Sequence, residues 1–194
     1  MIFSLILKIV VTSAFVILIY IPYRVIKLKK QCKKANILSE SKKLLFVIYL
    51  GILIALLLIP NASLFVGPDN KITFSTGIIP QRSSNLVPFH TLLIQVKNII
   101  NKNNENYPIL NVLGNSFLFI PFPILLKLNW NNLRIIKCFI ISFAGVISAE
   151  LIQYFEGRVF DIDDIILNGI SILLGIMIYV LFVKKLIVKS NDNV

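Results

Sequence analysis

Five long apolar segments constrain the fold of this chain more than any other feature of its sequence. They run from about Ile2 to Tyr23, Leu44 to Pro60, Ile109 to Leu128, Ile135 to Phe155 and Asp164 to Val183. A helix needs about twenty mainly apolar residues to cross a bilayer. Hydrophobic residues make up 57% of the chain, and the mean hydropathy is +0.84. The pattern therefore predicts an all-α integral membrane protein, a bundle of about five transmembrane helices.

The basic residues predict how these helices are oriented. The chain has 20 Lys and Arg against 9 Asp and Glu, a formal net charge of +11. Most of the basic residues fall within three stretches, 24–43, 127–137 and 184–194. Because cytoplasmic loops carry the excess of Lys and Arg, we expect the N-terminus outside and the C-terminus inside. The same distribution explains the net charge without a nucleic-acid partner, and we expect none.

This topology divides the chain into three parts. Residues 1–43 hold the first helix and a basic cytoplasmic loop, residues 44–183 form the helical domain, and residues 184–194 are a basic cytoplasmic tail. The two cysteines, Cys32 and Cys138, lack metal-binding spacing. Both are expected on the cytoplasmic side, where thiols stay reduced.

The outer loop of the domain, residues 61–108, is expected to contain two local structures. Residues 64–74 place turn-forming residues between two short β-prone runs, which predicts a hairpin. After Pro88 the apolar residues recur at helical spacing from Phe89 to Ile100, opposite polar residues. That pattern predicts an amphipathic helix on the outer membrane–water interface; a helix packed on top of the bundle is the alternative.

The segment between the fourth and fifth apolar segments concentrates the acidic residues. It holds five of the nine: Glu150, Glu156, Asp161, Asp163 and Asp164. Glu150 and Gln153 share a helix face, and Asp161, Asp164 and Asn168 form one stripe of the next helix. A helix N-terminus favours carboxylates, so one of the three aspartates can serve as its cap. Capping does not explain the other two, nor Asn168.

The third apolar segment carries an unusual polar face. Asn111, Gly114 and Asn115 lie at i, i+3 and i+4, and Pro121 and Pro123 follow. Asparagines in hydrocarbon need partners, so this face is expected to look into the bundle, where the side chains can simply bond neighbouring helices. The two prolines lack backbone donors and are expected to kink or open the helix.

Together these groups predict a polar pocket at the outer leaflet. Its residues are Asn111, Asn115, Glu150, Gln153, Asp161, Asp164 and Asn168. Three chemistries stay open for it: a Mg²⁺ or Ca²⁺ site, an amine-binding site, or acid–base catalysis. The candidate metal ligands are Glu150, Asp161, Asp163 and Asp164. The candidate catalytic groups are Glu150, Asp161 and Asp164.

The order of several short motifs is similar to that of the VanZ-like family. They are Asn85-Leu86-Val87-Pro88-Phe89, Asn111-Val112-Leu113-Gly114-Asn115, Phe119-Ile120-Pro121, Glu150-Leu151-Ile152-Gln153, Arg158-Val159-Phe160-Asp161-Ile162-Asp163-Asp164 and Asn168. The likeness covers roughly residues 44 to 183. Glycines usual in the family are replaced by Pro123 and Ser171, whereas Gly175 is retained.

The resemblance implies a small multi-pass protein of the bacterial cell membrane. The founding member of that family is linked to low-level resistance to teicoplanin, a lipid-tailed glycopeptide that acts on cell-wall precursors. The positions that the resemblance singles out are Asn115, Glu150, Gln153, Arg158, Asp161, Asp164 and Asn168. Besides the lipid bilayer, it implies a glycopeptide antibiotic or a cell-wall precursor as a partner.

Three functional hypotheses follow. The first is a cell-envelope factor that alters glycopeptide susceptibility through the outward-facing pocket. The second is an interfacial membrane enzyme acting on a lipid-linked or cell-wall substrate. In the third, the polar residues form a structural network that locks the helices together.

Overall fold

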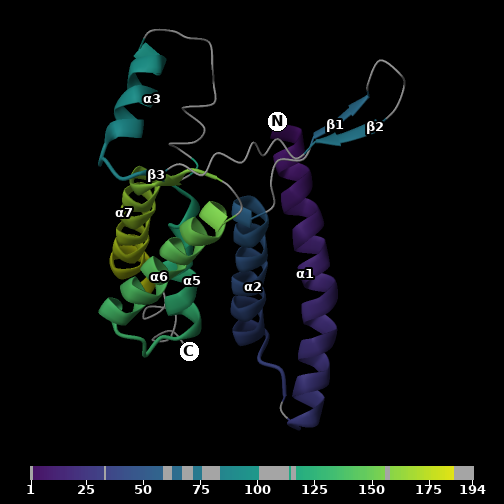
Figure 1. The fold of residues 1–194 in the computed structure, drawn as a ribbon. Coiled ribbons are helices and arrows are strands. Elements are labelled where there is room, and N and C mark those ends of the chain that lie inside the picture. Colours follow the sequence, from purple (N-terminus) through teal and green to yellow (C-terminus); the bar gives the residue numbers. More distant parts are fainter. Residues whose placement is uncertain are drawn as a thin grey trace.

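The computed structural model describes residues 2–32, 34–58, 63–66, 72–75, 84–100, 114, 117–155 and 158–185. They are mostly helical (Figure 1). The helices are α1 (Ile2–Lys30), α2 (Ile37–Leu58), α3 (His90–Ile100), α5 (Pro121–Asn129), α6 (Ile135–Phe155) and α7 (Ile162–Ile178), which continues into the π-helix η1 (Tyr179–Val183). The strands are β1 (Ser63–Val66), β2 (Ile72–Ser75), β3 (Ser84–Asn85) and β4 (Phe160–Asp161).

Three helical stretches in the described part of the chain are long and apolar enough to cross a membrane. They are Ile6–Lys30 of α1, the whole of α6, and Ile162–Val183 of α7 with η1. They correspond to the first, fourth and fifth apolar segments of the sequence. The second segment forms most of α2, whose first turns are polar. The third is divided, because α5 has nine residues and rises only about 14 Å at 1.5 Å per residue. A count of five spans stays a prediction.

The break before α5 follows from the backbone chemistry of its prolines. In a regular helix the N–H groups of residues 121 and 123 would donate to the carbonyls of Phe117 and Phe119, but proline has no N–H. Instead, Ile120 N donates to Phe117 O at 3.2 Å and Phe122 N donates to Phe119 O at 3.3 Å, which forms tighter turns. The carbonyl of Leu118 is left over, and the Tyr49 hydroxyl of α2 donates to it at 2.9 Å. Proline at the first position of a helix costs no hydrogen bond, so α5 begins at Pro121. The predicted opening of the helix is confirmed.

The core lies between α2, α5, α6 and α7. Its buried members are Leu53, Phe119, Phe122, Val146 and Ile172. Aromatic rings from α2 and α5 meet on one side of it, with the ring centroids of Phe46 and Phe122 6.1 Å apart. Many large apolar side chains remain exposed on the outer faces of the helices. That distribution is the one expected where lipid, not water, surrounds a bundle.

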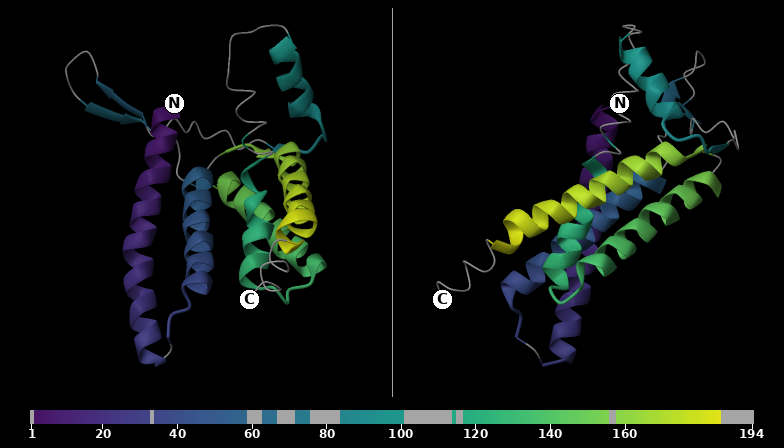
Figure 2. Two further views of the ribbon diagram at one scale, coloured as in Figure 1. Left: turned by 180° about the vertical axis from the view of Figure 1, so that it is seen from behind. Right: turned by 90° about the vertical axis from the view of Figure 1, so that its left-hand side faces the viewer.

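Helix α1 stands at the edge of this bundle and packs chiefly against α2 (Figures 1 and 2). Asn36 begins α2, because its side-chain oxygen accepts a hydrogen bond from Ser39 N at 3.2 Å. An ion pair then joins the two helices where they approach their connecting loop. Both Nε and Nη2 of Arg24 donate to Glu40, the latter at 2.8 Å, and Lys43 lies 2.9 Å from the same carboxylate.

This ion pair gives the α1–α2 contact a predictable pH dependence. Hydrogen bonds from Arg24 hold the pKa of the Glu40 carboxyl at about 2, against an ordinary value of 4.5. A lowered folded-state pKa stabilises the fold above pH 4.5, and that stabilisation is lost as the pH falls toward 2. We expect the thermal midpoint of the purified protein to drop between about pH 5 and pH 2, and to drop less in Glu40→Gln. Equal acid sensitivity in both proteins would contradict this prediction.

The two ends of the molecule differ in composition. The N-terminus of α1, the β1–β2 hairpin, α3, and the start of α7 lie at one end, which we call the acidic end (Figures 1 and 2). The loops joining α1 to α2 and α5 to α6 lie at the other, which we call the basic end. Lys127 of α5 is not a solvated loop charge, because it is buried and its ammonium donates to the carbonyls of Asn131 and Leu133 at 2.8 and 2.7 Å.

Both local structures predicted for residues 61–108 are present at the acidic end. β1 pairs with β2 in antiparallel register, with Ser63 opposite Ser75 and Val66 opposite Ile72. α3 projects away from the bundle beyond β3 (Figure 1), and its apolar residues Leu93, Val96 and Ile100 are exposed. The hairpin and the helix are confirmed, whereas the position of α3 on a membrane surface stays a prediction.

Candidate functional site

The first element of the site is the N-terminus of α7. Asp161 has an extended backbone and its side chain accepts a hydrogen bond from Asp163 N at 3.0 Å, which caps the helix. β4 holds this residue in place, because it pairs in parallel with β3 and sets Asn85 opposite Asp161. The predicted role of one aspartate as a helix cap is confirmed for Asp161.

Asp163 has a different and longer-range role. Its Oδ1 accepts from Phe89 N at 2.5 Å and its Oδ2 from Leu92 N at 3.1 Å, so this carboxylate caps α3, a helix 74 positions earlier in the chain. Phe89, the residue before α3, adopts a positive φ of 65°. Asp163 is 1% exposed. The sequence interpretation treated it as a possible metal ligand or cap of its own helix.

Asn85 completes this network. Its Nδ2 donates to Thr91 Oγ1 at 2.8 Å and to Asp161 Oδ1 at 3.1 Å, and its Oδ1 accepts from Val87 N at 3.2 Å. One side chain therefore joins β3, α3 and the start of α7. We call Asn85, Asp161 and Asp163 the latch. Asn85 was not among the predicted site residues. The sequence feature that could have indicated this network is the start of α3 at Pro88-Phe89-His90, because these residues offer no capping side chain.

Glu150 lies beside the latch on the buried stripe of α6. The stripe consists of Cys138, Ser142, Val146 and Glu150 at four-residue spacing, and Glu150 is 4% exposed. The carboxylates of Asp161 and Asp164 and the guanidinium of Arg158 all lie within electrostatic range of it. A buried carboxylate near two others is costly to maintain, so this arrangement has the character of a functional site.

The facing stripe of α7 is polar in its first half. It runs through Asp161, Asp164 and Asn168 to Ser171, and the last two are fully buried. Ser171 Oγ donates to Leu167 O at 3.0 Å within the helix. Among the described residues, none donates a hydrogen bond to Asn168 Oδ1, although this oxygen is inaccessible to solvent. Of the predicted stripe, Asp161 and Asn168 are buried and Asp164 is half-buried; that the three line one pocket stays a prediction.

The remaining predicted residues fall in two groups. Asn111 and Asn115 lie outside the described residues, as does Glu156. Gln153 and Arg158 are half-buried next to the turn between α6 and β4, where Arg158 N donates to Gln153 O at 3.0 Å. Lys8 of α1 lies within electrostatic range of Arg158. No residue of the first helix was predicted to lie near Arg158.

The geometry gives the metal interpretation no support. Within the part of the chain that the structure describes, no three His, Cys, Asp or Glu side chains lie close enough together to hold a metal ion. The reason is visible in the latch, where the carboxylates of Asp161 and Asp163 accept backbone N–H groups. Oxygens engaged in this way are poorly placed to replace the hydration shell of Mg²⁺ or Ca²⁺.

The fold and the site define a mostly helical, multi-pass membrane protein with a buried polar cluster at one end. The sequence profile of the VanZ/LLP1 family matches residues 46–183 of the 194 in the chain. The chain belongs to this family, as the order of its motifs indicated. No match was found among curated proteins, and none among solved structures.

Proposed function

We propose that this protein is a bacterial cell-envelope factor that changes susceptibility to teicoplanin-type glycopeptides. The burial of Glu150 beside Asp161, Asp164 and Arg158 carries the proposal. Such a cluster can bind the amines of a glycopeptide or of a cell-wall precursor. Asn111 and Asn115 belong to the same proposed pocket on the sequence argument alone.

The proposal includes an orientation. The basic end, with residues 24–43 and the α5–α6 loop, faces the cytoplasm by the distribution of Lys and Arg. The acidic end and its pocket then face outward, where glycopeptides meet their target. α3 supports this arrangement, because its exposed residues Leu93, Val96 and Ile100 can enter the outer leaflet beside the pocket.

Expression in a susceptible Gram-positive host tests the proposal. We expect the inhibitory concentration of a lipid-tailed glycopeptide to rise several-fold, and that of a glycopeptide without the tail to rise less. Glu150→Gln keeps the size of the side chain but removes its charge, and we expect it to return the host to its original susceptibility. Ser148→Ala is the matched control on α6, because Ser148 is exposed and its hydroxyl donates to Ala144 O of the same helix at 2.8 Å.

Western blotting of membranes separates this outcome from the structural hypothesis. If the polar cluster only locks helices together, Glu150→Gln lowers the amount of protein in the membrane along with resistance. If the cluster is a functional site, the amount is unchanged while resistance is lost. Unchanged susceptibility on expression of the wild-type protein, at a confirmed level in the membrane, would falsify the resistance proposal.

A second candidate function is an interfacial membrane enzyme, and the burial of Glu150 favours it. A carboxyl group kept from water is a common form of general acid or base, with Asp161 or Asp164 as its partner. The substrate would be lipid-linked or part of the cell wall. Altered lipid-linked precursors in cells with wild-type protein, absent in Glu150→Gln and in Asp164→Asn, would identify this activity.

A further inference from the structure

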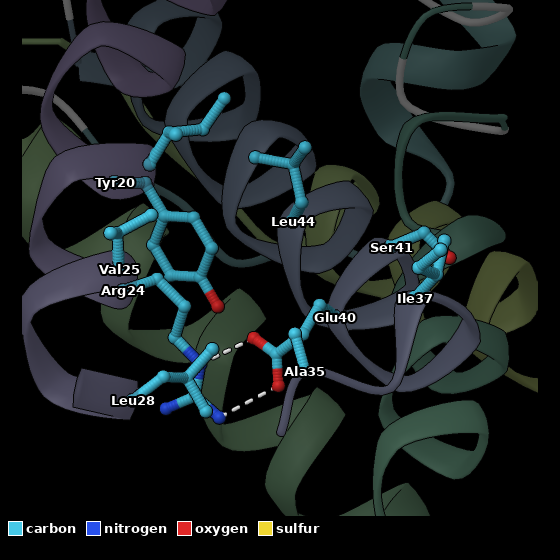
Figure 3. Close-up of a pocket in the computed structure, with 10 residues that line it drawn as sticks. Tyr20, Arg24, Val25, Leu28, Ala35, Ile37, Glu40, Ser41 and Leu44 are labelled. Atoms are coloured by element: carbon cyan, nitrogen blue, oxygen red, sulfur yellow. Dashed lines mark hydrogen bonds and ion pairs between the residues drawn. The ribbon is translucent and has the colours of Figure 1, made fainter. Parts of the chain in front are cut away.

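A groove of about 320 Å³ lies between α1 and α2 (Figure 3). It lies toward the α1–α2 loop, which is at the opposite end of the molecule from the start of α7 (Figure 2). Its walls are largely apolar, with Tyr20, Val25 and Leu28 from α1 facing Leu44 from α2. The Arg24–Glu40 ion pair crosses it (Figure 3). Because the groove is apolar and contains a charged pair, a ligand that fits it would have both an apolar part and a charged part.

Arg24 is placed to bind an anion there. Its side chain is 19% exposed, and Nε and Nη2 donate to Glu40. Figure 3 joins its third nitrogen, Nη1, to no other lining residue. Glu40 is shared between Arg24 and Lys43, so the three side chains together carry an excess positive charge. A guanidinium nitrogen without a carboxylate partner can donate to phosphate oxygens.

The surrounding sequence adds to this charge. Residues 24–43 contain eight basic residues and one acidic residue, Glu40. Lys29, Lys30 and Lys34 are exposed, and Lys29 and Lys34 directly adjoin the lining residues Leu28 and Ala35 in the chain. The distribution of Lys and Arg that orients a membrane protein needs only basic loops. Membrane orientation alone does not require an arginine within an apolar groove between two helices. Basic pockets between helices on the cytoplasmic side of a membrane bind anionic lipid headgroups.

We propose that this groove is a binding site for one anionic phospholipid. An acyl chain occupies the apolar part between Tyr20, Leu28 and Leu44. The headgroup phosphate accepts hydrogen bonds from Arg24 Nη1 and attracts the nearby lysines. The lipid then fills the space at the edge of the bundle where α1 is joined to α2, and so stabilises a helix that has few other contacts.

Native mass spectrometry of the full chain in a neutral detergent tests this site, with phosphatidylglycerol and phosphatidylcholine as probes. We expect one phosphatidylglycerol to bind about tenfold more tightly than phosphatidylcholine, the difference that one charge-assisted contact supplies. Equal binding of the two lipids would overturn the proposal. Free glycerol phosphate should not compete with phosphatidylglycerol for the site. Effective competition would show that the site binds the headgroup alone and does not use the apolar groove, which would contradict the proposal.

Two variants address the two halves of the site. Ala35→Phe fills the groove without changing its charge. The pair Arg24→Gln with Glu40→Gln removes the ion pair but leaves Lys43, so the net charge around the groove is unchanged. We expect both to lose the preference for phosphatidylglycerol. The pair Arg134→Gln with Lys137→Gln removes two positive charges from the other basic loop and should keep it. The proposal fails if both groove variants bind like the wild type, or if the control loses as much affinity as they do.

Discussion

Replacing Asp163 by alanine is expected to release α3 from the bundle. The carboxylate accepts the backbone N–H groups of Phe89 and Leu92 while it is 1% exposed. Without it, two donors at the start of α3 lose their partner, at a cost of about 1–3 kcal/mol. Because α3 is short and has few other contacts with the bundle, the loss is expected to appear there first.

Hydrogen–deuterium exchange of the purified protein measures this release. We expect amides of residues 86–100 to exchange at least about tenfold faster in Asp163→Ala, since 1.4 kcal/mol corresponds to a factor of ten. Asp163→Asn keeps one acceptor oxygen and should fall between the alanine variant and the wild type. Ser148→Ala is the unaffected control. Wild-type exchange of α3 in Asp163→Ala would show that its contacts, and not the cap, hold this helix.

The latch also connects α3 to the proposed pocket. Asp161 accepts from Asn85 and lies within electrostatic range of Glu150, and Asp163 follows two residues later. A movement of α3 would therefore displace the backbone turn that carries Asp161 and Asp163, and with it the Asp161 carboxylate beside Glu150. If the pocket binds a glycopeptide or a cell-wall precursor, Asp163→Ala should weaken resistance even though Asp163 itself is fully occupied in capping.

The features of the fold that the sequence predicted correctly depend on residues that are close together in the chain. The break before α5 follows from Pro121 and Pro123, and the inward position of Glu150 follows from helical spacing. The cap at Asp161 follows from its place at a helix start. Each of these arguments uses residues within a few positions of one another, where the geometry of a helix determines which side chains meet.

What the sequence did not predict depends on pairs of residues far apart. The contact of Asp163 with Phe89 joins two segments through the tertiary fold, and no periodicity indicates it. The same applies to Lys8 near Arg158 and to the Tyr49 hydroxyl on Leu118 O. The sequence signal that went unused is the start of α3, where no local side chain caps the first N–H groups and another partner, from the protein or from water, is needed.

Gly175→Ala is expected to be among the most destabilising single-methyl changes in the bundle. A Cβ at this position would overlap the carbonyl oxygen of Ile120 and lie 2.7 Å from Pro123 Cγ. The obstacle is backbone and a proline ring, neither of which can rotate away. α7 would have to move off the break that precedes α5, and overpacking of this kind costs about 1–3 kcal/mol.

Gly145→Ala is the matched control, because in the described part of the chain no atom beyond its chain neighbours and its own helix backbone lies within 4 Å of a Cβ built there. Alanine favours a helix over glycine by up to about 1 kcal/mol, so this variant should keep or raise the thermal midpoint that Gly175→Ala lowers by several degrees. Equal midpoints for the two variants would mean that α7 can slide past Ile120 at little cost. In that case the close approach at Gly175, the family glycine that this chain retains, would not fix the position of the α7 stripe that carries Asp164 and Asn168.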